Sequence, residues 1–438
     1  MPSTSFVYRG AAGLARAVLP LIANAGPKLK RGHAGRLAAP ARLARWAATG
    51  RDPSRHLVWF HASSVGEGLQ AEAVLRRIRA RHPDWQIAYT YYSPSAEDFA
   101  TRTGADVTDY LPYDVPAAAE RVLAALRPDA LVYSKLDLWP ELACRADQHG
   151  VRVGLLAATV RPSSRRLETP IRQLLRPGYA TVRAAGAVAE DDAARLVQLG
   201  VPREHIRVLG DPRFDSVIDR VRSVSPSDPL LRYGAGAPTM VAGSTWPGDE
   251  EVLLTAFSRI HVRRPEARLI LVPHEPSEEH LRGVETRARL LGLPAPVRLS
   301  QAAGPVPLLL VDRVGVLATI YGAGTMAAVG GGFHGAGLHS VLEPAAWERP
   351  VVFGPRWTES RDAALLLRAG GAEAIAELGT GEAAETLGKL WEDWMVNERR
   401  RSAQGRKALA VVQSGIGAAE RTADLVEALV LNGQPRRP

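Results

Sequence analysis

Short apolar segments alternate with helical patterns along most of this chain, and the alternation limits the folds open to it. The expected strands are 56–60, 87–92, 129–134, 151–158, 185–190, 205–210, 238–245, 267–273, 305–312 and 349–355. Helical patterns, such as 69–82, lie between most of them. Apolar strands separated by helices are typical of parallel sheets that are covered on both faces. The predicted fold class is therefore α/β, with doubly wound sheets.

A chain of 438 residues is long for one core, so we expect two domains. Residues 216–237 are rich in Ser, Pro and Asp and are the expected linker. The expected divisions are 1–55, 56–222 and 223–438, with the last helix returning to the N-terminal domain. The single cysteine, Cys144, excludes an intramolecular disulfide, and no Cys/His spacing predicts a metal site.

The positive charge is concentrated at the N-terminus. Residues 1–55 hold ten Lys or Arg and one acid, Asp52, so the whole net charge of +9 falls there. A neutral body argues against a nucleic-acid partner. Apolar residues recur at helical spacing at Val7, Ala11, Leu14, Val18, Leu21 and Ile22. Because Arg16 interrupts this short run, we expect an amphipathic helix on an anionic membrane surface, not a spanning helix. The alternative is a solvated basic helix packed on the body.

Polar turns follow three of the expected strands, where ligands bind in parallel sheets. In the turn 61–68, Glu67 lies at a helix start, which favours an ionised carboxylate that can take a proton from a hydroxyl. The alternative is that Glu67 caps the helix, and Ser63 or Ser64 could also do so. His61 could equally be a hydrogen-bonded interior residue.

Two further turns carry charged side chains. Lys135 and Asp137 lie two residues apart, on the same side if the strand continues. The alternative is a surface ion pair before a helix that begins at Trp139-Pro140. After the strand 151–158, Arg161, Arg165 and Arg166 form a candidate anion site or a solvated basic loop.

A glycine-rich segment, Gly330 to Ala346, reads GGGFHGAGLHSVLEPAA. Glycines allow close backbone approach, and a following helix start favours anions, so we expect a nucleotide-phosphate site with Glu343 as a ribose contact. The segment 330–335 matches G-x-G-x-x-G, but it lies late in its domain and no acid ends the next strand, which argues against NAD. The chain contains no P-loop motif. Two Rossmann-like halves with a nucleotide site in the second predict the GT-B architecture of glycosyltransferases, with two domains facing a cleft.

Several segments together resemble one family. They are HASSVGE (61–67), LDLWPEL (136–142), VRPSSRR (160–166), GSTWPGDEE (243–251), LVPHEP (271–276) and the glycine-rich block 330–355. They are similar, in order, to motifs of the Kdo transferases, which move 3-deoxy-D-manno-octulosonic acid (Kdo) from CMP-Kdo to lipid A precursor in lipopolysaccharide biosynthesis. The resemblance implies an inverting, metal-independent enzyme without a cofactor, at the cytoplasmic face of the inner membrane.

The resemblance also implies roles for individual residues. Glu67 would be the general base, with Asp137 as a second carboxylate. Ser64, Lys135 and Arg161 would contact the acceptor or an anion. The residues implied in donor binding are Ser244, Thr245, His274, Gly331, Gly332, Gly335, Gly337, Ser340 and Glu343.

Three motifs depart from the family pattern. Lys135 and Asp137 stand where the family commonly has two Glu, His274 stands where it has Arg, and Ser340 replaces an Asn. These differences leave two alternatives open. One is a transferase of the same family with a different donor or acceptor. The other is a weakly active, membrane-associated binding protein, for which Glu67 would be dispensable.

Overall fold

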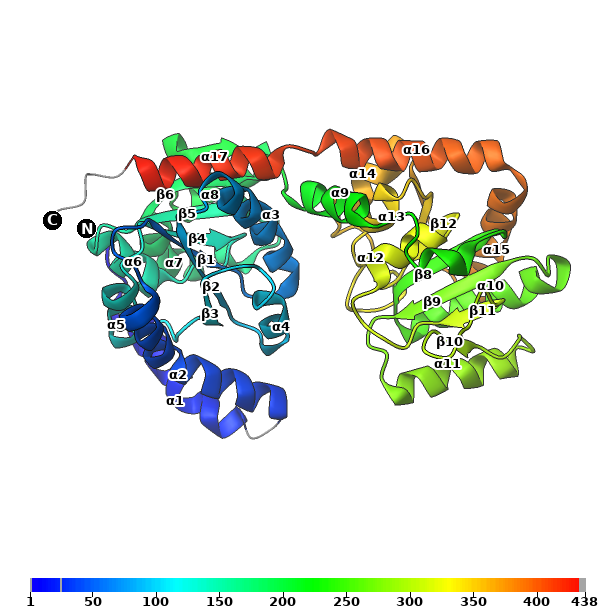
Figure 1. Ribbon diagram of the computed structural model, residues 1–438, viewed down its shortest axis with the longest axis horizontal. Helices are drawn as coiled ribbons and strands as arrows, with labels where there is room; N and C mark the ends of the chain where they lie inside the picture. The colour runs from blue at the N-terminus through cyan, green and yellow to red at the C-terminus, as the bar shows by residue number, and fades with distance from the viewer. Residues whose placement is uncertain (1, 24–25, 433–438) are drawn as a thin grey trace. The chain divides into compact units, whose positions relative to one another are not determined.

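The computed structural model describes residues 2–23 and 26–432. The chain forms two compact units: unit 1 comprises Met1–Ser216 and Gly415–Pro438, and unit 2 comprises Val217–Ser414. Each unit contains one seven-stranded sheet (Figure 1). Every recorded strand pairing in both sheets is parallel, so the predicted α/β class is confirmed.

The sheet of unit 1 has the strand order β3-β2-β1-β4-β5-β6-β7. Its strands are β1 (Leu57–His61), β2 (Gln86–Tyr91), β3 (Val107–Tyr110), β4 (Ala130–Ser134), β5 (Arg152–Ala158), β6 (Val182–Ala187) and β7 (Ile206–Val208). The helices between them are α3 (Val65–Arg81), α4 (Glu97–Ala100), α5 (Pro116–Leu126), α6 (Pro140–Gln148), α7 (Ile171–Tyr179) and α8 (Glu190–Leu199). Helix α9 (Arg213–Ser223) crosses from unit 1 into unit 2.

The sheet of unit 2 has the order β10-β11-β9-β8-β12-β13-β14. Its strands are β8 (Thr239–Thr245), β9 (Arg268–Pro273), β10 (Val297–Arg298), β11 (Leu308–Leu310), β12 (Met326–Val329), β13 (Val351–Phe353) and β14 (Ala372–Ala374). Its helices are α10 (Pro247–Arg263), α11 (Glu278–Leu290), α12 (Leu317–Ile320), α13 (Leu342–Ala346), α14 (Arg361–Ala369), α15 (Thr380–Val396) and α16 (Glu398–Ser414).

Both sheets are buried on their two faces. In β1, Leu57 and Trp59 pack into one apolar cluster, whereas Val58 and Phe60 pack into another. In unit 2, Met240 and Val241 likewise belong to different clusters. Because successive side chains of a strand point to opposite faces, this distribution requires helices on both sides. The GT-B architecture predicted from the sequence, with two Rossmann-like units, is confirmed at the level of each unit.

Some local expectations need correction. The strand expected at 185–190 is β6, which begins three residues earlier, and the expected linker 216–237 is partly helical because α9 extends to Ser223. The segment after the glycines is not helical at once: residues 330–341 form a loop, called here the glycine loop, and α13 begins only at Leu342. The predicted helix start at Pro140 is confirmed.

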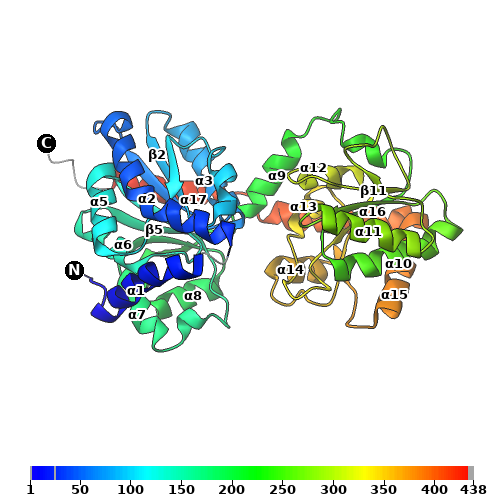
Figure 2. The ribbon, with the colours of Figure 1, turned by 90° about the horizontal axis from the view of Figure 1, so that it is seen from below.

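The N-terminal basic region forms two helices, α1 (Phe6–Ala23) and α2 (Pro27–Gly50). Helix α2 packs against α5 and β3, and α1 packs against α2 (Figures 1 and 2). Part of the positive charge is structural, since Arg42 binds Asp109 and Arg51 donates to the Leu126 carbonyl at 2.9 Å. The remaining basic residues include Lys28 and Lys30, which are exposed.

The last helix, α17 (Ala418–Leu431), belongs to unit 1 and packs against α3, β4, β5 and β6. Its start is fixed by Asp215, whose two carboxylate oxygens accept from the N–H groups of Gly417 (2.8 Å) and Ala419 (2.9 Å). Figure 1 shows this helix in red beside α3, in blue.

Candidate functional site

A cavity of about 340 Å³ lies in unit 1 at the carboxyl ends of β4 and β5. Five residues singled out from the sequence line it together: Glu67, Lys135, Asp137, Arg161 and Arg166. The loop after β5 adds Ser163 and Ser164 to the lining. Two carboxylates and three cationic side chains therefore share one small space, which suits a polar, anionic ligand.

Glu67 sits in the first turn of α3, but its carboxylate does not cap the helix. The cap is Ser64, whose hydroxyl oxygen accepts from the Glu67 N–H at 3.5 Å. The Glu67 Oε2 atom is buried and, among the described residues, has no hydrogen-bond partner. Its backbone carbonyl accepts from the Ser134 hydroxyl at 3.0 Å. The helix start thus fixes the position of the carboxylate, although Oε2 makes no hydrogen bond to the described residues.

Lys135 directly follows β4 and has an uncommon backbone conformation, with φ of 56°. The strand therefore does not continue through Lys135. The prediction that Lys135 and Asp137 lie on the same side required a continuing strand, so it does not hold on that ground. Burial lowers the pKa of the Lys135 ammonium, and the Glu67 carboxylate acts in the opposite direction. Since strained backbone conformations concentrate at functional sites, this residue is a candidate for ligand contact.

Asp137 is held by His61, an interior residue with no exposed surface. The His61 Nε2 atom lies 3.0 Å from Asp137 Oδ2, and Nδ1 lies 3.0 Å from both the carbonyl and the hydroxyl oxygen of Thr90. With Nε2–H donating to the carboxylate, Nδ1 can accept from the Thr90 hydroxyl. The expectation of a hydrogen-bonded interior histidine is confirmed, and His61 fixes the orientation of Asp137.

In unit 2, Asp249 fastens the glycine loop. Its carboxylate accepts from the backbone N–H groups of Trp246 (2.9 Å), Gly331 (2.8 Å) and Phe333 (3.0 Å). Asp249 is 2% exposed. Burial raises its pKa, and the three N–H groups act in the opposite direction. The Gly331 N–H group therefore already has a partner within the protein, the Asp249 carboxylate at the start of α10.

Glycines in this loop are needed for close packing of strand ends. A Cβ on Gly330 would lie 2.3 Å from the Ser244 carbonyl oxygen, and one on Gly332 would lie 2.4 Å from the Gly354 nitrogen. Gly331 and Gly337 have φ of 87° and 86°, which side chains disfavour. Gly335 and Ser340 are exposed, so they lie on the accessible side of the loop.

Two other residues expected near the donor, Thr245 and Glu343, have side-chain partners within unit 2. The Thr245 hydroxyl donates to Glu250 Oε1 at 2.8 Å, and both Glu250 oxygens lie 2.9 Å from His280 Nε2. Ser244, beside it, has φ of 54°. Glu343 accepts from Arg220 Nη1 at 2.9 Å. Burial raises the pKa of the Glu343 carboxyl, whereas Arg220 acts to lower it.

His274 belongs to an aromatic cluster that sequence reasoning missed. Its ring lies 4.9 Å from that of Trp246 and 4.4 Å from that of His339, and His334 stacks on Trp246 at 4.3 Å. The available signal was Asp249, three residues after Trp246. This capping spacing indicates a helix start, but it does not reveal the loop that Asp249 holds.

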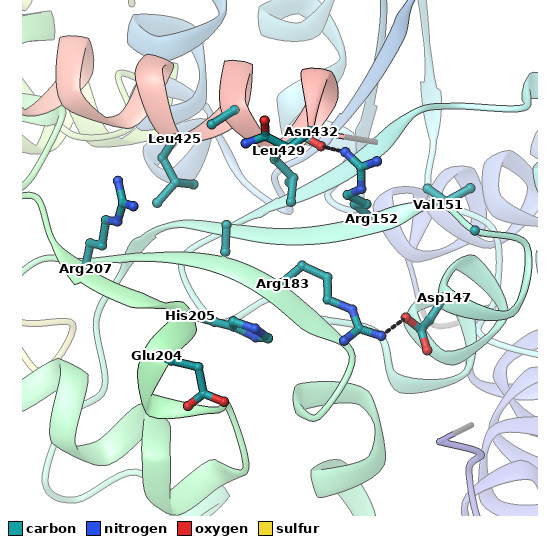
Figure 3. A pocket seen from close by; sticks show the side chains of 13 residues that line it. Asp147, Val151, Arg152, Arg183, Glu204, His205, Arg207, Leu425, Leu429 and Asn432 are labelled. Atoms are coloured by element: carbon teal, nitrogen blue, oxygen red, sulfur yellow. Dashed lines mark hydrogen bonds and ion pairs between the residues drawn. The ribbon is translucent and has the colours of Figure 1, made fainter. Parts of the chain in front are cut away.

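A second cavity in unit 1, of about 510 Å³, lies at the amino ends of β5, β6 and β7 (Figure 3). Two of its cationic side chains already serve the fold: Arg183 pairs with Asp147 at 2.8 Å, and Arg152 donates to the Leu429 carbonyl of α17. Since ligands of parallel sheets bind at carboxyl ends, we do not assign the substrate to this cavity.

Within residues 2–23 and 26–432, no group of three or more His, Cys, Asp or Glu side chains is arranged to hold a metal ion. Over the same part of the chain, no helix combines the length and the apolar character needed to cross a membrane.

Comparison with known proteins shows which proteins the chain is similar to in sequence. Residues 38–216 match the family model described as 3-deoxy-D-manno-octulosonic-acid transferase (kdotransferase). A curated 3-deoxy-D-manno-octulosonic acid transferase from Bordetella pertussis is 28% identical over 410 residues, which cover 89% of this chain and 91% of the relative.

Solved structures share the fold at low identity. A UDP-GlcNAc 2-epimerase from Neisseria meningitidis has a TM-score of 0.61 at 12% identity and covers 86% of this chain and 100% of its own. A glycosyltransferase from Rickettsia africae has a TM-score of 0.59 at 9% identity, with coverage of 86% and 100%. Because this fold also serves an epimerase, the fold alone does not define the reaction.

The two parallel α/β units define the GT-B class, and the sequence relatives make the chain a glycosyltransferase. More particularly, it is a homologue of the Kdo transferases, so the resemblance inferred from its motifs is confirmed.

Proposed function

We propose that this chain transfers Kdo from CMP-Kdo to a lipid A precursor in lipopolysaccharide biosynthesis. The observation that carries the proposal is the alignment of a relative named for Kdo transfer with 89% of the chain, including both units. The cavity of unit 1 supports it, because cationic side chains beside a carboxylate suit a phosphorylated sugar acceptor.

In the proposed reaction, Glu67 takes the proton of the acceptor hydroxyl as that oxygen bonds to the anomeric carbon of Kdo. The bond from that carbon to the CMP phosphate breaks, CMP leaves, and the configuration at carbon is inverted. Lys135, Arg161 and Ser64 contact the acceptor or its anionic groups, and Asp137 is oriented by His61. The proposal requires no metal ion, since N–H groups can stabilise the single phosphate of the leaving CMP.

For the donor, we propose contacts from the exposed side of the glycine loop and the adjoining strand ends. The candidates are Ser244, Thr245, His274, Gly331, Gly332, Gly335, Gly337, Ser340 and Glu343. Three of their polar groups are engaged by side chains, namely the Gly331 N–H by Asp249, the Thr245 hydroxyl by Glu250 and the Glu343 carboxylate by Arg220. For these three, donor contact requires sharing or exchange of the present partner.

The purified protein is expected to move radiolabelled Kdo from CMP-Kdo to tetra-acylated lipid A precursor. The measurement is the appearance of label in the lipid fraction. Omission of the acceptor is the control, because it separates transfer from hydrolysis of the donor. Absence of transfer under conditions in which a curated relative is active would contradict the proposal.

A second candidate is a transferase of the same family with another sugar donor or acceptor. Lys135 favours it, because this cation stands in the cavity where the family commonly has an acid. The same assay distinguishes the two candidates, since a different acceptor preference predicts CMP release with other phosphorylated lipids but no labelled lipid A precursor.

We further propose that α1 attaches the protein to the cytoplasmic face of the inner membrane. Apolar side chains of α1 are exposed: Phe6 (88%), Val7 (68%) and Leu14 (65%). Other side chains hold the helix to unit 1, since Tyr8 donates to Asp114 at 2.6 Å and Arg9 donates to Glu141 at 2.9 Å. An apolar face and nearby exposed cations suit an anionic lipid surface.

Replacing Phe6, Val7 and Leu14 together by Ser is expected to release the protein from anionic vesicles, because the apolar contact is lost while the Tyr8 and Arg9 contacts remain. Vesicle flotation measures binding. The matched control replaces Val197 and Val208, exposed elsewhere on unit 1. High salt is expected to weaken wild-type binding, since exposed charges are screened. Unchanged flotation of the α1 variant would locate the contact elsewhere.

A further inference from the structure

Trp246, at the start of α10, lies among three imidazole rings. Its ring centroid is 4.3 Å from that of His334, 4.9 Å from that of His274 and 6.4 Å from that of His339. The rings of His334 and His339 are nearly parallel to the indole, at 7° and 9°. The cluster joins residues that follow β8, β9 and β12, so it occupies the carboxyl edge of the unit 2 sheet.

In one hydrogen bond of the cluster, the chemistry of the two groups fixes which is the donor and which is the acceptor. The Trp246 Nε1–H group lies 3.0 Å from His339 Nε2. An indole nitrogen can only donate, so Nε2 must offer its lone pair. The proton of the neutral His339 ring is then on Nδ1. Protonation of Nε2 would remove the acceptor and bring two N–H groups into opposition.

The backbone fixes both partners. The Trp246 N–H donates to Asp249, and the His339 N–H donates to the Gly330 carbonyl at 3.1 Å. Burial lowers the pKa of His339 to about 4, with His274 and His334 acting in the same direction. The nearby acid, Asp249, is occupied by three backbone N–H groups. His339 is therefore neutral at physiological pH, and no residue within the described part of the chain accepts from its Nδ1.

We infer that Trp246 holds His339 in the Nδ1–H tautomer, so that the neutral ring donates a hydrogen bond to an anionic oxygen of the bound nucleotide. This inference rests on the proposed function, which supplies the nucleotide as CMP. Trp246 is then a positioning residue, and His339 is a donor-contact residue. A neutral donor binds and releases the phosphate without gaining or losing a proton.

The test uses the full-length protein with ¹⁵N-labelled histidine, and the His339 signals are assigned by His339→Gln. In the ligand-free wild type, the ring nitrogens of His339 are expected to show the Nδ1–H tautomer down to about pH 5. In Trp246→Phe, which keeps an aromatic ring but removes the N–H, the tautomers are expected to mix and the pKa of His339 to rise. CMP is expected to shift the Nδ1–H signal of the wild type and to bind Trp246→Phe about tenfold more weakly, the lower end for loss of a hydrogen bond to a charged group.

The matched control is Trp347→Phe. Trp347 also lies in unit 2 and donates its indole N–H to a carbonyl, that of Ala318 at 2.7 Å. It should leave the His339 tautomer and CMP affinity unchanged. An Nε2–H tautomer in the wild type, or an unchanged His339 spectrum in Trp246→Phe, overturns the positioning role. Binding of CMP without a shift at His339 overturns the contact role alone. If the wild type does not bind CMP, the contact role fails together with the proposed donor, whereas the ligand-free spectra still decide the positioning role.

Discussion

Glu67→Gln is expected to lower the turnover number of sugar transfer by about 10²- to 10⁴-fold, the range for loss of a general base. The amide has the shape of the carboxylate but cannot take the acceptor proton. The change should cost little stability, because no hydrogen bond to the Glu67 carboxylate exists among the described residues. Loss of turnover with an unchanged melting temperature would therefore report chemistry and not unfolding.

The measurement is the rate of label transfer at saturating CMP-Kdo and acceptor. The control is Glu72→Gln, on the same helix, whose carboxylate pairs with Arg76 at 2.6 Å and does not line the cavity. That variant should keep wild-type turnover. Full turnover in Glu67→Gln would remove the general-base assignment even if Kdo transfer itself is correct, and it is the result expected of a binding protein.

Asp249→Ala is expected to destabilise unit 2 by about 3 kcal/mol or more. Three backbone N–H groups lose their acceptor, and each buried unsatisfied donor costs about 1–3 kcal/mol. CMP binding should be lost as well, because the glycine loop and Trp246 are both held by this carboxylate. Asp249→Asn keeps one acceptor oxygen but turns an amide N–H toward the loop, so its stability should lie between those of wild type and Asp249→Ala.

Denaturant unfolding gives the stability, and calorimetric titration gives the affinity for CMP. The matched control is Glu251→Gln, two residues further along the same helix, where the carboxylate is half-exposed and pairs with Arg287. A small effect is expected there. Wild-type stability of Asp249→Ala would show that the loop does not depend on this residue.

The strands that were predicted well are those with strong apolar runs. The strands β1, β5 and β8 begin within one residue of their expected positions. The strand β12 was not predicted, because MAAV is short and contains two alanines, which have little β-propensity. The strands β3, β10 and β14 were also missed, and they have four residues or fewer. Such segments become strands through their neighbours in the sheet, which local sequence does not reveal.

In the candidate sites, the candidate residues could be predicted from the sequence, whereas their hydrogen-bond partners could not. Glu67, Lys135, Asp137 and Arg161 could be grouped from sequence because parallel strands bring their carboxyl ends to one edge, and one cavity contains all four. Their catalytic roles remain predictions. The partners of these residues could not be deduced. His61 reaches Asp137 across 76 positions, and Asp249 reaches Gly331 across 82, so both contacts depend on how loops from separate strands fold.

The return of α17 to unit 1 affects synthesis of the protein. The apolar face that it covers includes Ala157 of β5, which shares a cluster with Ala423, Val426 and Val430 of α17. On the ribosome, residues 217–414 emerge before this helix, so unit 2 is complete in the nascent chain while that face of unit 1 is still uncovered. Domains generally fold as units during synthesis. Unit 2 can therefore finish folding first, and a premature stop codon before residue 418 would damage the core of the unit that was synthesised earlier.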